Sequence, residues 1–408
     1  MTNLPQGWEW KSLGEICFIT DGTHKTPNYI ETGIPFLSVK NISKGFFDLS
    51  DVKYISLEEH NKLIKRAKPE FEDILICRIG TLGKAIKISL EFEFSIFVSL
   101  GLLKPKVKII SDYLVYFLNS YFIEGWINDN KVGGGTHTAK LNLNILEKCP
   151  IALPPLKEQE RIVGILDESF AKIDESIKIL EQDLLNLDEL MQSALQKAFN
   201  PLKDNVKENY KLPQSWEWKS LGEIGEIITG TTPSKNNPNF YGNEYPLFKP
   251  SDLNGDIIIK YASDNLSKLG FDNARNLPKD TILVVCIGAS IGKVGLSGVN
   301  GSCNQQINAI IPNSAFTSKY LFFVCLSNYF QTILKKNASQ TTLPIINKTE
   351  FSKLQIPLPP IKEQEQIAKH LDFVFEKTKA LKELYTKELK DYEELKQSLL
   401  NKAFKGEL

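Results

Sequence analysis

The chain has 408 residues, 42% of them hydrophobic, and its 49 basic and 49 acidic residues leave no net charge. This length suits two or three domains, each with an apolar core of its own. The zero net charge argues against a protein held on nucleic acid by its overall field, although it allows phosphate contacts at particular places. The excess charge is slightly positive over 1–155 and 201–360 and negative over 156–200.

The six cysteines are scattered and include no Cys-x-x-Cys pair, so we expect buried, reduced thiols and no metal site. The chain opens on a polar, proline-containing segment, which does not resemble a signal peptide. No apolar run approaches the length of a membrane span. The composition therefore predicts a soluble, cytoplasmic protein with no membrane partner.

Three sequence blocks occur twice, once in each half of the chain. They are LPQGWEWKSLGEI (4–16) and LPQSWEWKSLGEI (212–224), LPPLKEQERIVGILD (153–167) and LPPIKEQEQIAKHLD (358–372), and SALQKAF (193–199) and SLLNKAF (398–404). A repeat of half the chain is far too long for a solenoid, whose units run to roughly 20–50 residues. It indicates two similar domains related by a pseudo-two-fold axis. Duplex DNA, with approximate two-fold symmetry of its own, is the commonest partner of such a protein.

In chain order, a strand-rich domain is expected first, at 1–155. Its apolar runs, such as DILICRIG at 73–80, are short and bounded by Gly, Asn, Asp and Pro, which is typical of strands. Short helices are expected at 57–67 and 111–128. A Pro-Pro pair then ends the domain and favours the start of a helix, because the first turn of a helix tolerates proline.

The next segment, 156–200, is predicted to be one long helix. Its apolar and small residues are spaced alternately by three and four, which is the period of a coiled-coil seam. The helix is expected to stop at an Asn-Pro pair, an ordinary stop signal. The predicted seam comprises Ile162, Leu166, Ile173, Ile177, Leu180, Leu184, Leu187, Met191, Ala194 and Ala198.

A polar linker, 201–211, leads to a second strand-rich domain at 212–360, with a helix expected at 315–336. Another Pro-Pro pair precedes a second long helix at 361–408. Its predicted seam is interrupted by Thr378 and Glu388. The seam residues are Ile367, Leu371, Val374, Leu381, Tyr385, Tyr392, Leu395 and Leu399.

The fold class expected from this order is α+β, with two similar strand-rich globular domains separated by two long helices. About 43 residues at 1.5 Å each make a rod of roughly 65 Å, which is too long to bury its stripe against one small domain. The two helices are therefore predicted to pack on each other as an antiparallel coiled coil with pseudo-two-fold symmetry. The C-terminus then lies close to the first domain.

Several motifs that resemble enzyme sites lack a required part. The segment from Gly288 to Lys293 has three residues between its glycines, where a phosphate-binding loop needs four, and Val294 stands where that loop has Ser or Thr. The segment 237–240, Asn-Pro-Asn-Phe, lacks the second proline of an adenine methyltransferase motif, and no Gly-rich cofactor loop precedes it. The histidines are dispersed, which predicts no catalytic residues and no metal site. They are His24, His60, His137 and His370.

The ordered set of motifs resembles the specificity subunit of type I restriction–modification systems. In each half, LPxxW followed by KxLGxI opens a domain, and LPPLKEQ or LPPIKEQ closes it. IGTLGK (79–84) and IGASIGK (287–293) stand in mid-domain, and KAFKGEL (402–408) ends the second long helix. The resemblance covers 4–408, twice over and in the family's order.

The resemblance implies a non-catalytic subunit in which target-recognition domains at 1–155 and 212–360 are held on spacer helices at 156–200 and 361–408. Each domain reads one half of a bipartite, asymmetric target in double-stranded DNA. Expected partners are two methyltransferase (modification) subunits and two restriction subunits with ATP-dependent nuclease and translocase activity. S-adenosylmethionine, ATP and Mg²⁺ are expected on those partners and no cofactor in this chain.

The resemblance also implies that the start of each long helix docks the methyltransferase subunits. The charged stretches LKEQER and IKEQEQ are interpreted as an exposed surface and not as a catalytic carboxylate pair, because glutamates two apart on a helix point in different directions. The residues assigned to partner binding are Lys157, Glu158, Gln159, Lys362, Glu363 and Gln364.

Because the two domains are expected to read different half-sites, shared residues should belong to the scaffold and divergent ones to readout. The paired tryptophans near each domain start are therefore expected to pack in the core. The halves diverge at 20–33 against 229–242 and at 133–142 against 337–347, in residue types that reach base edges and phosphates. The DNA-binding candidates are Thr23, His24, Lys25, Lys40, Asn41, Arg78, Lys84, Thr136, His137 and Lys140 in the first domain, and Thr232, Ser234, Lys235, Asn236, Lys249, Lys293, Gln305, Gln306, Gln340 and Thr341 in the second.

Three alternatives remain open at this point. A self-contained DNA methyltransferase or nuclease would need a cofactor loop and catalytic motifs. A coiled-coil scaffold for protein partners would not need the divergent polar loops. The third alternative is a specificity subunit of a related restriction–methylation system outside type I.

The predicted coiled coil also suggests a ruler. One inserted heptad would add about 10 Å, close to three base-pair steps, and keep the seam in register. The hypothesis is that the insertion lengthens the spacer between half-sites and changes neither half-site.

Overall fold

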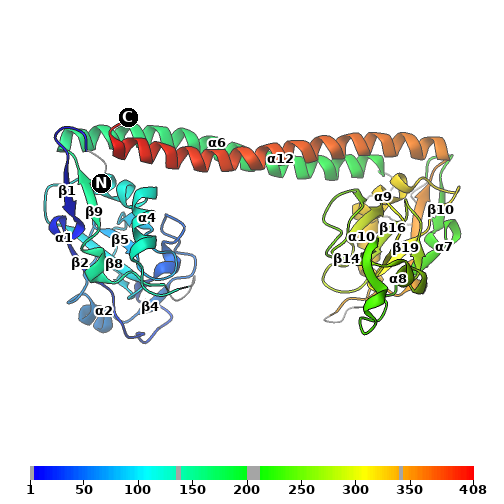
Figure 1. Cartoon of the computed structure of the whole chain (residues 1–408), viewed down its shortest axis with the longest axis horizontal. Helices are drawn as coiled ribbons and strands as arrows, with labels where there is room; N and C mark the ends of the chain where they lie inside the picture. Colours follow the sequence, from blue (N-terminus) through cyan, green and yellow to red (C-terminus); the bar gives the residue numbers. More distant parts are fainter. Residues whose placement is uncertain (1–3, 135–138, 200–211, 340–342) are drawn as a thin grey trace. The chain divides into compact units, whose positions relative to one another are not determined.

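The computed structural model describes residues 4–134, 139–199, 212–339 and 343–408. The chain divides into two compact units: unit 1 is Met1–Leu180 with Lys387–Leu408, and unit 2 is Glu181–Thr386. Each unit has a strand-rich globular part and segments of two long helices (Figure 1). The predicted linker, 201–211, lies outside the described residues.

Unit 1 is built on a four-stranded antiparallel sheet in the order β2-β8-β5-β6. Beside it are a three-stranded sheet, β4-β3-β7, and the antiparallel pair β1-β9. The strands are β1 (Glu9–Ser12), β2 (Cys17–Asp21), β3 (Ile34–Leu37), β4 (Lys53–Ile55), β5 (Ile74–Cys77), β6 (Ala85–Lys87), β7 (Ser95–Ile96), β8 (Leu100–Pro105) and β9 (Pro150–Leu153).

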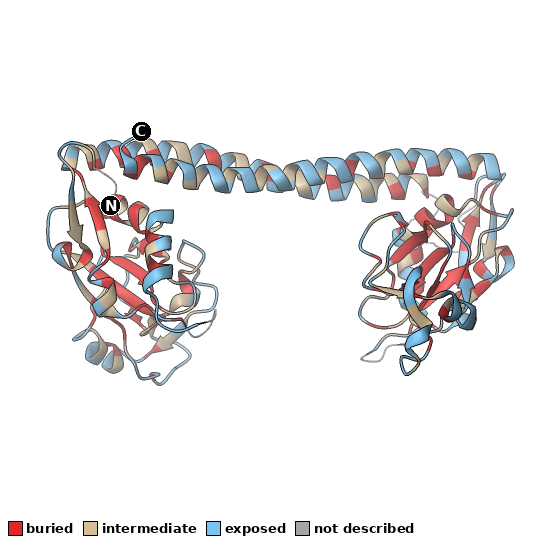
Figure 2. Ribbon diagram, viewed as in Figure 1, coloured by how far each residue is buried: buried red, intermediate tan, exposed pale blue. Residues whose placement is uncertain are grey.

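The central strand β5 is buried on both faces (Figure 2). Its side chains alternate between two apolar clusters, with Ile74 and Ile76 in one and Leu75 and Cys77 in the other. This alternation follows from the two-residue period of a strand. It explains why β5 is apolar at every position, as a strand covered on both sides must be.

Short helices complete unit 1. They are α1 (Leu13–Ile16), η1 (Val39–Asn41), α2 (Leu57–Leu63), α3 (Ser111–Leu118), α4 (Tyr121–Asn130) and α5 (Leu143–Leu146). The helix predicted at 57–67 starts as expected but ends four residues early, and the one predicted at 111–128 is two helices. Ser120 separates them, with its Oγ donating to the Phe117 carbonyl at 2.7 Å. The hydroxyl replaces the main-chain bond that would continue the helix.

Unit 2 repeats this plan with additional strands. Its main sheet has the order β11-β19-β16-β17-β13, its second sheet β14-β12-β18-β15, and β10 pairs with β20. The central strand β16 again divides its side chains between two apolar clusters. The strands are β10 (Glu217–Ser220), β11 (Ile227–Thr229), β12 (Tyr241–Phe248), β13 (Ile258–Ile259), β14 (Asp264–Leu266), β15 (Asn276–Leu277), β16 (Ile282–Val285), β17 (Val294–Ser297), β18 (Gly301–Cys303), β19 (Ile307–Ile310) and β20 (Gln355–Leu358).

The short helices of unit 2 are α7 (Leu221–Ile224), η3 (Pro238–Phe240), α8 (Lys268–Asn273), α9 (Ser318–Leu326), α10 (Asn328–Lys336) and α11 (Lys348–Ser352). The single helix predicted at 315–336 is α9 and α10. Ser327 separates them as Ser120 does in unit 1, with its Oγ donating to the Val324 carbonyl at 2.6 Å. Both corrections therefore have one cause, a serine whose hydroxyl binds a carbonyl in the last turn of one helix and whose position is the N-cap of the next.

Two long helices, α6 (Leu156–Ala198) and α12 (Ile361–Lys405), contribute to both units. In unit 1 the last turns of α12 share one apolar core with the first turns of α6, where Phe404 lies in the same cluster as Ile162 and Leu166. The Phe404 ring is 4.8 Å from that of Phe117 in α3, centroid to centroid. The C-terminal end of the chain is thus part of the core of unit 1.

The two helices run antiparallel within each unit. Lys396 of α12 forms an ion pair with Asp174 of α6 in unit 1, and Lys382 forms one with Asp188 in unit 2. The higher-numbered lysine pairs with the lower-numbered aspartate, as an antiparallel pair requires. The two lysines, like the two aspartates, are two heptads apart in sequence.

The seam predicted for the second long helix is wrong at three places. Thr378, predicted to interrupt it, is buried, and its Oγ1 contacts the carbonyl oxygens of Val374 at 3.0 Å and Phe375 at 2.9 Å. Because the helix itself accepts the hydroxyl proton, the side chain carries no unsatisfied donor into the seam. Leu381 and Leu395, predicted inside, are 37% and 45% exposed.

A buried glutamine fastens the start of each long helix to its globular part. The Gln159 Oε1 accepts from the Ile110 amide and its Nε2 donates to the Pro154 carbonyl, both at 2.9 Å. Gln364 makes the equivalent bonds in unit 2. Each carboxamide thereby joins the residue before α3 or α9, the Pro-Pro pair and the long helix.

The core packing predicted for the tryptophans is confirmed for Trp216, which is buried, and wrong for Trp218, which is 36% exposed, while Trp8 and Trp10 are half-buried against the core of unit 1. Trp10 lies 5.5 Å from Phe122, ring centroid to ring centroid, and Trp218 lies 5.7 Å from Tyr329, so each closes an edge of its unit on an aromatic ring. The repeated blocks therefore serve as scaffold, as their repetition indicates.

Replacing Phe404 with alanine is expected to lower the free energy of unfolding of unit 1 by about 3 kcal/mol, because it leaves a cavity between α12 and α3. Hydrogen exchange of the β5 and β16 amides, measured during a denaturant titration, reports the unfolding of unit 1 and of unit 2 separately. Phe373→Ala, on the same helix but 62% exposed, is the matched control and should change little. Equal losses in the two variants would contradict the assignment of Phe404 to the core.

Candidate nucleic-acid interface

The hydrogen-bond ladders of the two main sheets establish which residues are equivalent. Asp21 at the end of β2 pairs with Gly101, and Thr229 at the end of β11 pairs with Asn308. The ladders that join β8 to β5 and β19 to β16 continue in the same register. Asp21 and Thr229 therefore occupy the same place in the two units.

A glycine follows each of these residues for a steric reason. A Cβ at Gly22 would lie 2.0 Å from the Ile96 carbonyl oxygen, and one at Gly230 would lie 2.2 Å from that of Cys303. Only glycine lets the chain pass so close to the neighbouring strand. The loops that leave the two sheets thus start from the same backbone position, although their sequences differ.

Arg78, which follows β5, is equivalent to Cys286, which follows β16. The Arg78 carbonyl accepts from the Leu141 amide at 2.9 Å, and the Cys286 carbonyl accepts from the Ile346 amide at 3.0 Å. The same backbone contact therefore holds a charged side chain in unit 1 and a thiol in unit 2.

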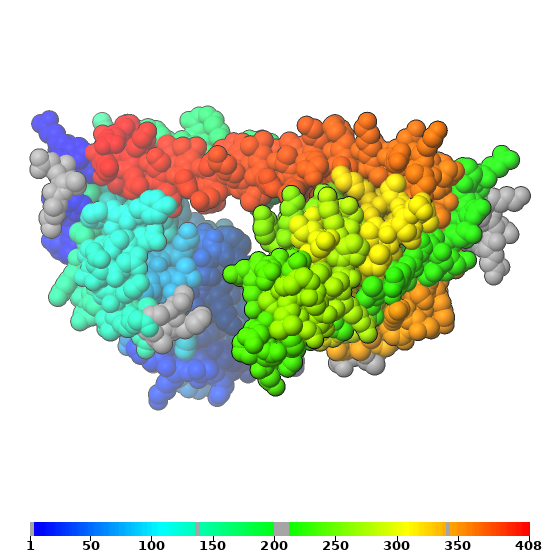
Figure 3. All heavy atoms as spheres, turned by 45° about the vertical axis from the view of Figure 1, so that its right-hand side comes forward, coloured from blue at the N-terminus to red at the C-terminus, as the bar shows by residue number. Residues whose placement is uncertain are grey.

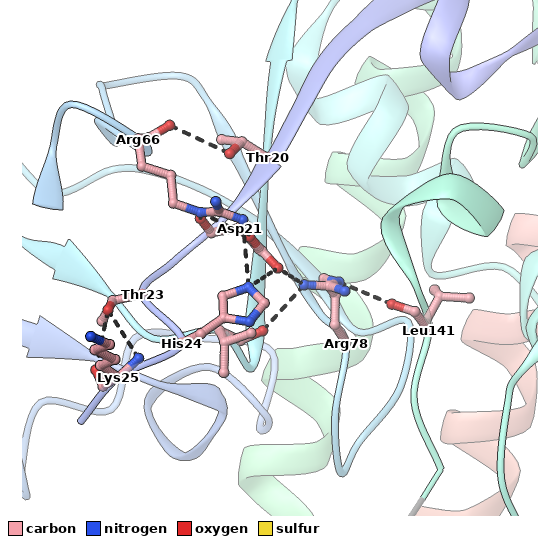
Figure 4. Close-up of polar contacts among 9 residues, drawn as sticks. Thr20, Asp21, Thr23, His24, Lys25, Arg66, Arg78 and Leu141 are labelled. Carbon is pink, nitrogen blue, oxygen red and sulfur yellow. Dashed lines mark hydrogen bonds and ion pairs between the residues drawn. The ribbon is translucent and has the colours of Figure 1, made fainter.

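In unit 1, four side chains form the Asp21 cluster: Asp21, His24, Arg66 and Arg78 (Figure 4). Both arginines form ion pairs with the Asp21 carboxylate. The Arg66 Nε also donates to the Asp21 carbonyl at 3.1 Å, and the Arg78 Nε donates to the Leu141 carbonyl at 2.9 Å. The His24 Nε2 lies 3.1 Å from the second carboxylate oxygen.

The cluster has a buried base and an exposed rim. The Asp21 side chain is 2% exposed and that of Arg78 is 10%, whereas those of Arg66 and His24 are 53% and 63%. Burial alone would raise the Asp21 pKa, but hydrogen bonds and charge from Arg66 and Arg78 outweigh it and hold the pKa below its usual value. The carboxylate stays ionised and fixes the direction of both guanidinium groups.

Around this rim lies a surface hollow whose lining includes no acidic side chain. A turn closed by the Thr23 Oγ1, which accepts from the Lys25 amide at 3.2 Å, forms one side. Basic side chains form much of the rest: Lys25 and Arg66 are exposed, and Lys62 of α2 also pairs with Glu58. Their excess positive charge favours an anionic ligand. The lining residues are Thr23, His24, Lys25, Lys62, Leu63 and Arg66.

At the corresponding place unit 2 has neutral hydrogen-bonding side chains together with Arg275, whose Nη1 donates to the Thr229 carbonyl at 2.6 Å. The Thr229 Oγ1 donates to the Asn308 Oδ1 at 2.7 Å, and the Thr232 Oγ1 donates to the Gln305 Oε1 at 2.9 Å. Gln306 stands beside them with its Nε2 3.4 Å from the Ile287 carbonyl. An arginine is present in both units, but the amides and hydroxyls around it in unit 2, against the carboxylate and imidazole of unit 1, offer a different donor and acceptor pattern.

The exposed loop of unit 2 that precedes β12 carries three predicted residues, Ser234, Lys235 and Asn236. The Ser234 Oγ accepts from the Asn236 amide at 3.3 Å and shapes the turn. Residues 231–240 are green in Figure 3 and form part of the surface of the unit.

The lysine predictions differ in their surroundings. Lys84 and Lys293 precede the equivalent strands β6 and β17, and they are half-buried and exposed respectively. Lys40 and Lys140 are exposed. Lys249 already forms an ion pair with Asp264. The last of these lysines is therefore partly neutralised within the protein.

Asn41 is buried, and both of its polar side-chain atoms are in use. Its Oδ1 accepts from the Ser38 amide at 2.9 Å and its Nδ2 donates to the Asp48 carbonyl at 3.0 Å. It builds the turn after β3, and this geometry presents no side-chain group to a ligand. Four further predicted residues lie outside the described residues: Thr136, His137, Gln340 and Thr341.

The predicted partner-binding residues are not all on the surface. Lys157 and Lys362 are exposed, but Gln159 and Gln364 are each 1% exposed. The exposed-face interpretation fails for these two, because both amides bind backbone groups inside their units. Glu158 pairs with Arg161, and Glu363 accepts from the Trp216 Nε1 at 2.9 Å.

Two residues of the Asp21 cluster were not among the predicted ones, Asp21 and Arg66. They are 45 residues apart in sequence, so no local pattern joins them. The scarcity of arginine was the available signal. The chain has four arginines among its 49 basic residues, and two of them meet at Asp21.

All six cysteines are buried and free, as predicted. Burial raises the thiol pKa to about 12 in Cys17, Cys77, Cys149, Cys286 and Cys303. Within the described ranges, no group of three or more His, Cys, Asp or Glu side chains could hold a metal ion. No helix in the described part of the chain is long and apolar enough to cross a membrane.

One family model, the type I restriction modification DNA specificity domain, matches this chain twice, at 5–184 and 213–391. The chain is also similar to the type I restriction enzyme StySPI specificity subunit of Salmonella potsdam. They are 26% identical over 428 residues, which cover 99% of this chain and 90% of the relative.

Two solved structures share the fold. One, described as the structural basis underlying complex assembly and conformational transition of the type I R-M system, has a TM-score of 0.80 and 22% identity, with full coverage of both chains. The other, the HsdS subunit from Thermoanaerobacter tengcongensis, has a TM-score of 0.58 and 22% identity, and the match covers 100% of this chain and 99% of that one. These matches confirm the predicted fold class.

Replacing Asp21 with asparagine is expected to lower the free energy of unfolding of unit 1 by about 3 kcal/mol near pH 7, because Arg78 stays buried without its anion. The Asp21 pKa is depressed in the folded state, so its contribution is complete above the unfolded pKa of about 3.9 and is lost as the pH falls through the folded-state pKa.

The measurement is the difference in unfolding free energy between wild type and Asp21→Asn from pH 7 to pH 2. It should be constant down to about pH 4 and shrink below that value. Asp51→Asn, whose carboxylate is 76% exposed, serves as the control and should change little. A difference that grows on acidification would contradict the ion-pair account.

Proposed function

This chain belongs to the type I restriction–modification DNA specificity family, and on that premise we propose that it selects the DNA target for its complex. Each unit reads one half of a bipartite, asymmetric target in double-stranded DNA. In unit 1 the reading surface includes the rim of the Asp21 cluster, and in unit 2 it includes the Thr232–Gln305 pair and the loop before β12.

The observation that carries the proposal is the replacement of side chains on an unchanged backbone. Asp21 and Arg78 in unit 1 stand where unit 2 has Thr229 and Cys286, at the ends of equivalent strands. Two scaffolds of the same kind with different polar groups suit two different base sequences. A protein scaffold without a DNA role would have no need of this difference.

The proposal assigns no catalytic step to the chain. Methylation would belong to two methyltransferase subunits with S-adenosylmethionine, and cleavage to two restriction subunits with ATP and Mg²⁺. The exposed Lys157 and Lys362, at the starts of α6 and α12, are the proposed contacts for the methyltransferase subunits. Glu158 and Glu363, which follow these lysines and are half-buried, are also proposed to contact the methyltransferase subunits.

Methylation mapping tests the proposal directly. Cells that co-express this chain with the methyltransferase subunit of its complex are expected to show a split, asymmetric motif with one modified adenine on each strand. Sequencing that detects methyladenine across the genome gives the motif. A continuous, palindromic motif would contradict the two-reader proposal.

Exchanging residues 212–357 for the corresponding segment of another family member is the matched control. Only the half-site read by unit 2 should change, because the Asp21 cluster and its hollow remain intact. A simultaneous change in both half-sites would show that the units do not read independently.

The long helices give a second test. One heptad inserted at matched places in α6 and α12 adds about 10 Å and keeps the seam in register. The motif is expected to keep both half-sites and to gain about three base pairs in its spacer. Inserting three residues in each helix, which rotates the seam away, is the control and should abolish methylation. A motif with an unchanged spacer after the heptad insertion would exclude the ruler.

A further inference from the structure

One exposed arginine in each unit is attached to the same backbone carbonyl. In unit 1 the Arg66 Nε donates to the Asp21 carbonyl at 3.1 Å, and in unit 2 the Arg275 Nη1 donates to the Thr229 carbonyl at 2.6 Å. Asp21 and Thr229 are equivalent by ladder register. The two arginines therefore reach the same point of the fold.

Each arginine also has a backbone contact with a threonine, although the two contacts differ in kind. Each arginine follows a short helix, Arg66 after α2 and Arg275 after α8, and each is exposed. The Arg66 carbonyl accepts from the Thr20 Oγ1 at 3.4 Å, and the Arg275 amide donates to the Thr231 Oγ1 at 3.1 Å. The two threonines occupy different positions in the register, so only the contact with the Asp21 or Thr229 carbonyl is equivalent in the two units.

This repetition is unusual for the chain. The chain uses lysine for nearly all of its positive charges and has only four arginines. The sequences around Arg66 and Arg275 share no block of the kind that recurs elsewhere. The position has thus retained a guanidinium although its surroundings diverged.

We infer that Arg66 and Arg275 are equivalent contacts to the DNA backbone, each binding a phosphate in the half-site of its unit. The inference rests on the proposed function. Readout of bases must differ between the two units, whereas a phosphate is the same in every sequence, so a feature kept in both units suits the phosphate. A guanidinium held by a carbonyl keeps further N–H groups for a phosphate oxygen.

The surroundings in unit 1 agree with an anionic ligand. Arg66 lines the hollow together with His24, Lys25 and Lys62. The single negative charge of Asp21 neutralises one of the two positive charges of Arg66 and Arg78, so the cluster keeps an excess positive charge at its exposed rim. In unit 2, Arg275 is beside the hydroxyl and amide groups that are proposed to read bases, and its contact would fix their register on the duplex.

Phosphate ethylation interference tests the inference. The DNA carries the motif that methylation mapping identifies, and the protein is the full chain in complex with its methyltransferase subunits. With wild type, ethylation of particular phosphates in each half-site should weaken binding. Arg66→Ala should remove this sensitivity at one or two phosphates of the unit 1 half-site only, and Arg275→Ala should do so in the other half-site only. The motif preferred by each variant should stay that of wild type.

Salt dependence gives a second readout. Each variant should lower the slope of log affinity against log salt by about 0.9, so the affinity advantage of wild type should shrink about 3.5-fold between 50 and 200 mM salt. Lys65→Ala and Lys279→Ala, exposed lysines near the two arginines in sequence, are charge-matched controls and should leave the footprint unchanged. Arg66→Lys and Arg275→Lys should retain most of the slope because they keep the charge.

The outcomes are distinguishable. An altered base preference in one half-site would overturn the inference in favour of base contact, and an unchanged footprint and slope would overturn it outright. If wild type binds no split target, the proposed function fails before the variants are compared. Thermal melting of each variant shows whether that variant is folded. Arg66→Ala removes an ion pair with Asp21 and can destabilise unit 1, whereas Arg275→Ala removes no such pair. The Arg275 variant therefore tests the phosphate contact even if the Arg66 variant is unstable.

Discussion

One strand in each unit is buried on both faces, and the distribution of chemistry in the molecule follows from that constraint. Because β5 and β16 send alternate side chains into two apolar clusters, neither strand has room for a polar residue along its length. In unit 1 the first residue beyond the strand is the charged Arg78, whereas in unit 2 it is Cys286, which still belongs to the apolar cluster. Strands β2 and β11, separated from β5 and β16 by β8 and β19, end near the same level with Asp21 and Thr229. The apolar interior thereby gathers the variable residues at one edge of each main sheet.

Much of this architecture could be predicted from the sequence because it is repeated. The duplicated blocks indicate two strand-rich units, and the spacing of apolar residues indicates two long helices. The misplaced details each involve a polar side chain that is satisfied by nearby backbone. Ser120 and Ser327 divide predicted helices, and Thr378 enters the seam of α12. Periodicity follows hydrophobicity alone and therefore reports such residues as surface or as interruptions.

The candidate site was predictable in part. Divergence between the halves indicated the segment 20–33, which contains Asp21 and His24, and the loop that carries Thr232. It could not indicate Arg66 or its ion pair with Asp21, which spans 45 residues of sequence. The halves also had to be aligned through their ladders before Arg66 and Arg275 became equivalent. Comparing the two repeats as structures therefore adds information that comparing them as sequences does not, because the backbone has retained a correspondence that the side chains have lost.

Unit 1 is assembled from two segments that are far apart in the chain, and this affects the order in which the two units can fold during synthesis. Unit 2 is one continuous stretch, Glu181–Thr386, whereas unit 1 needs both its own residues and Lys387–Leu408. A ribosome releases the chain from the N-terminus onward. The unit that is synthesised first therefore waits for the last residues of the protein, and the unit synthesised second can fold before it. During that interval the apolar surface that Leu400, Ala403 and Phe404 will cover is open to solvent and to chaperones. A chain released before its last turns of helix would carry a complete second reader beside an unfinished first one.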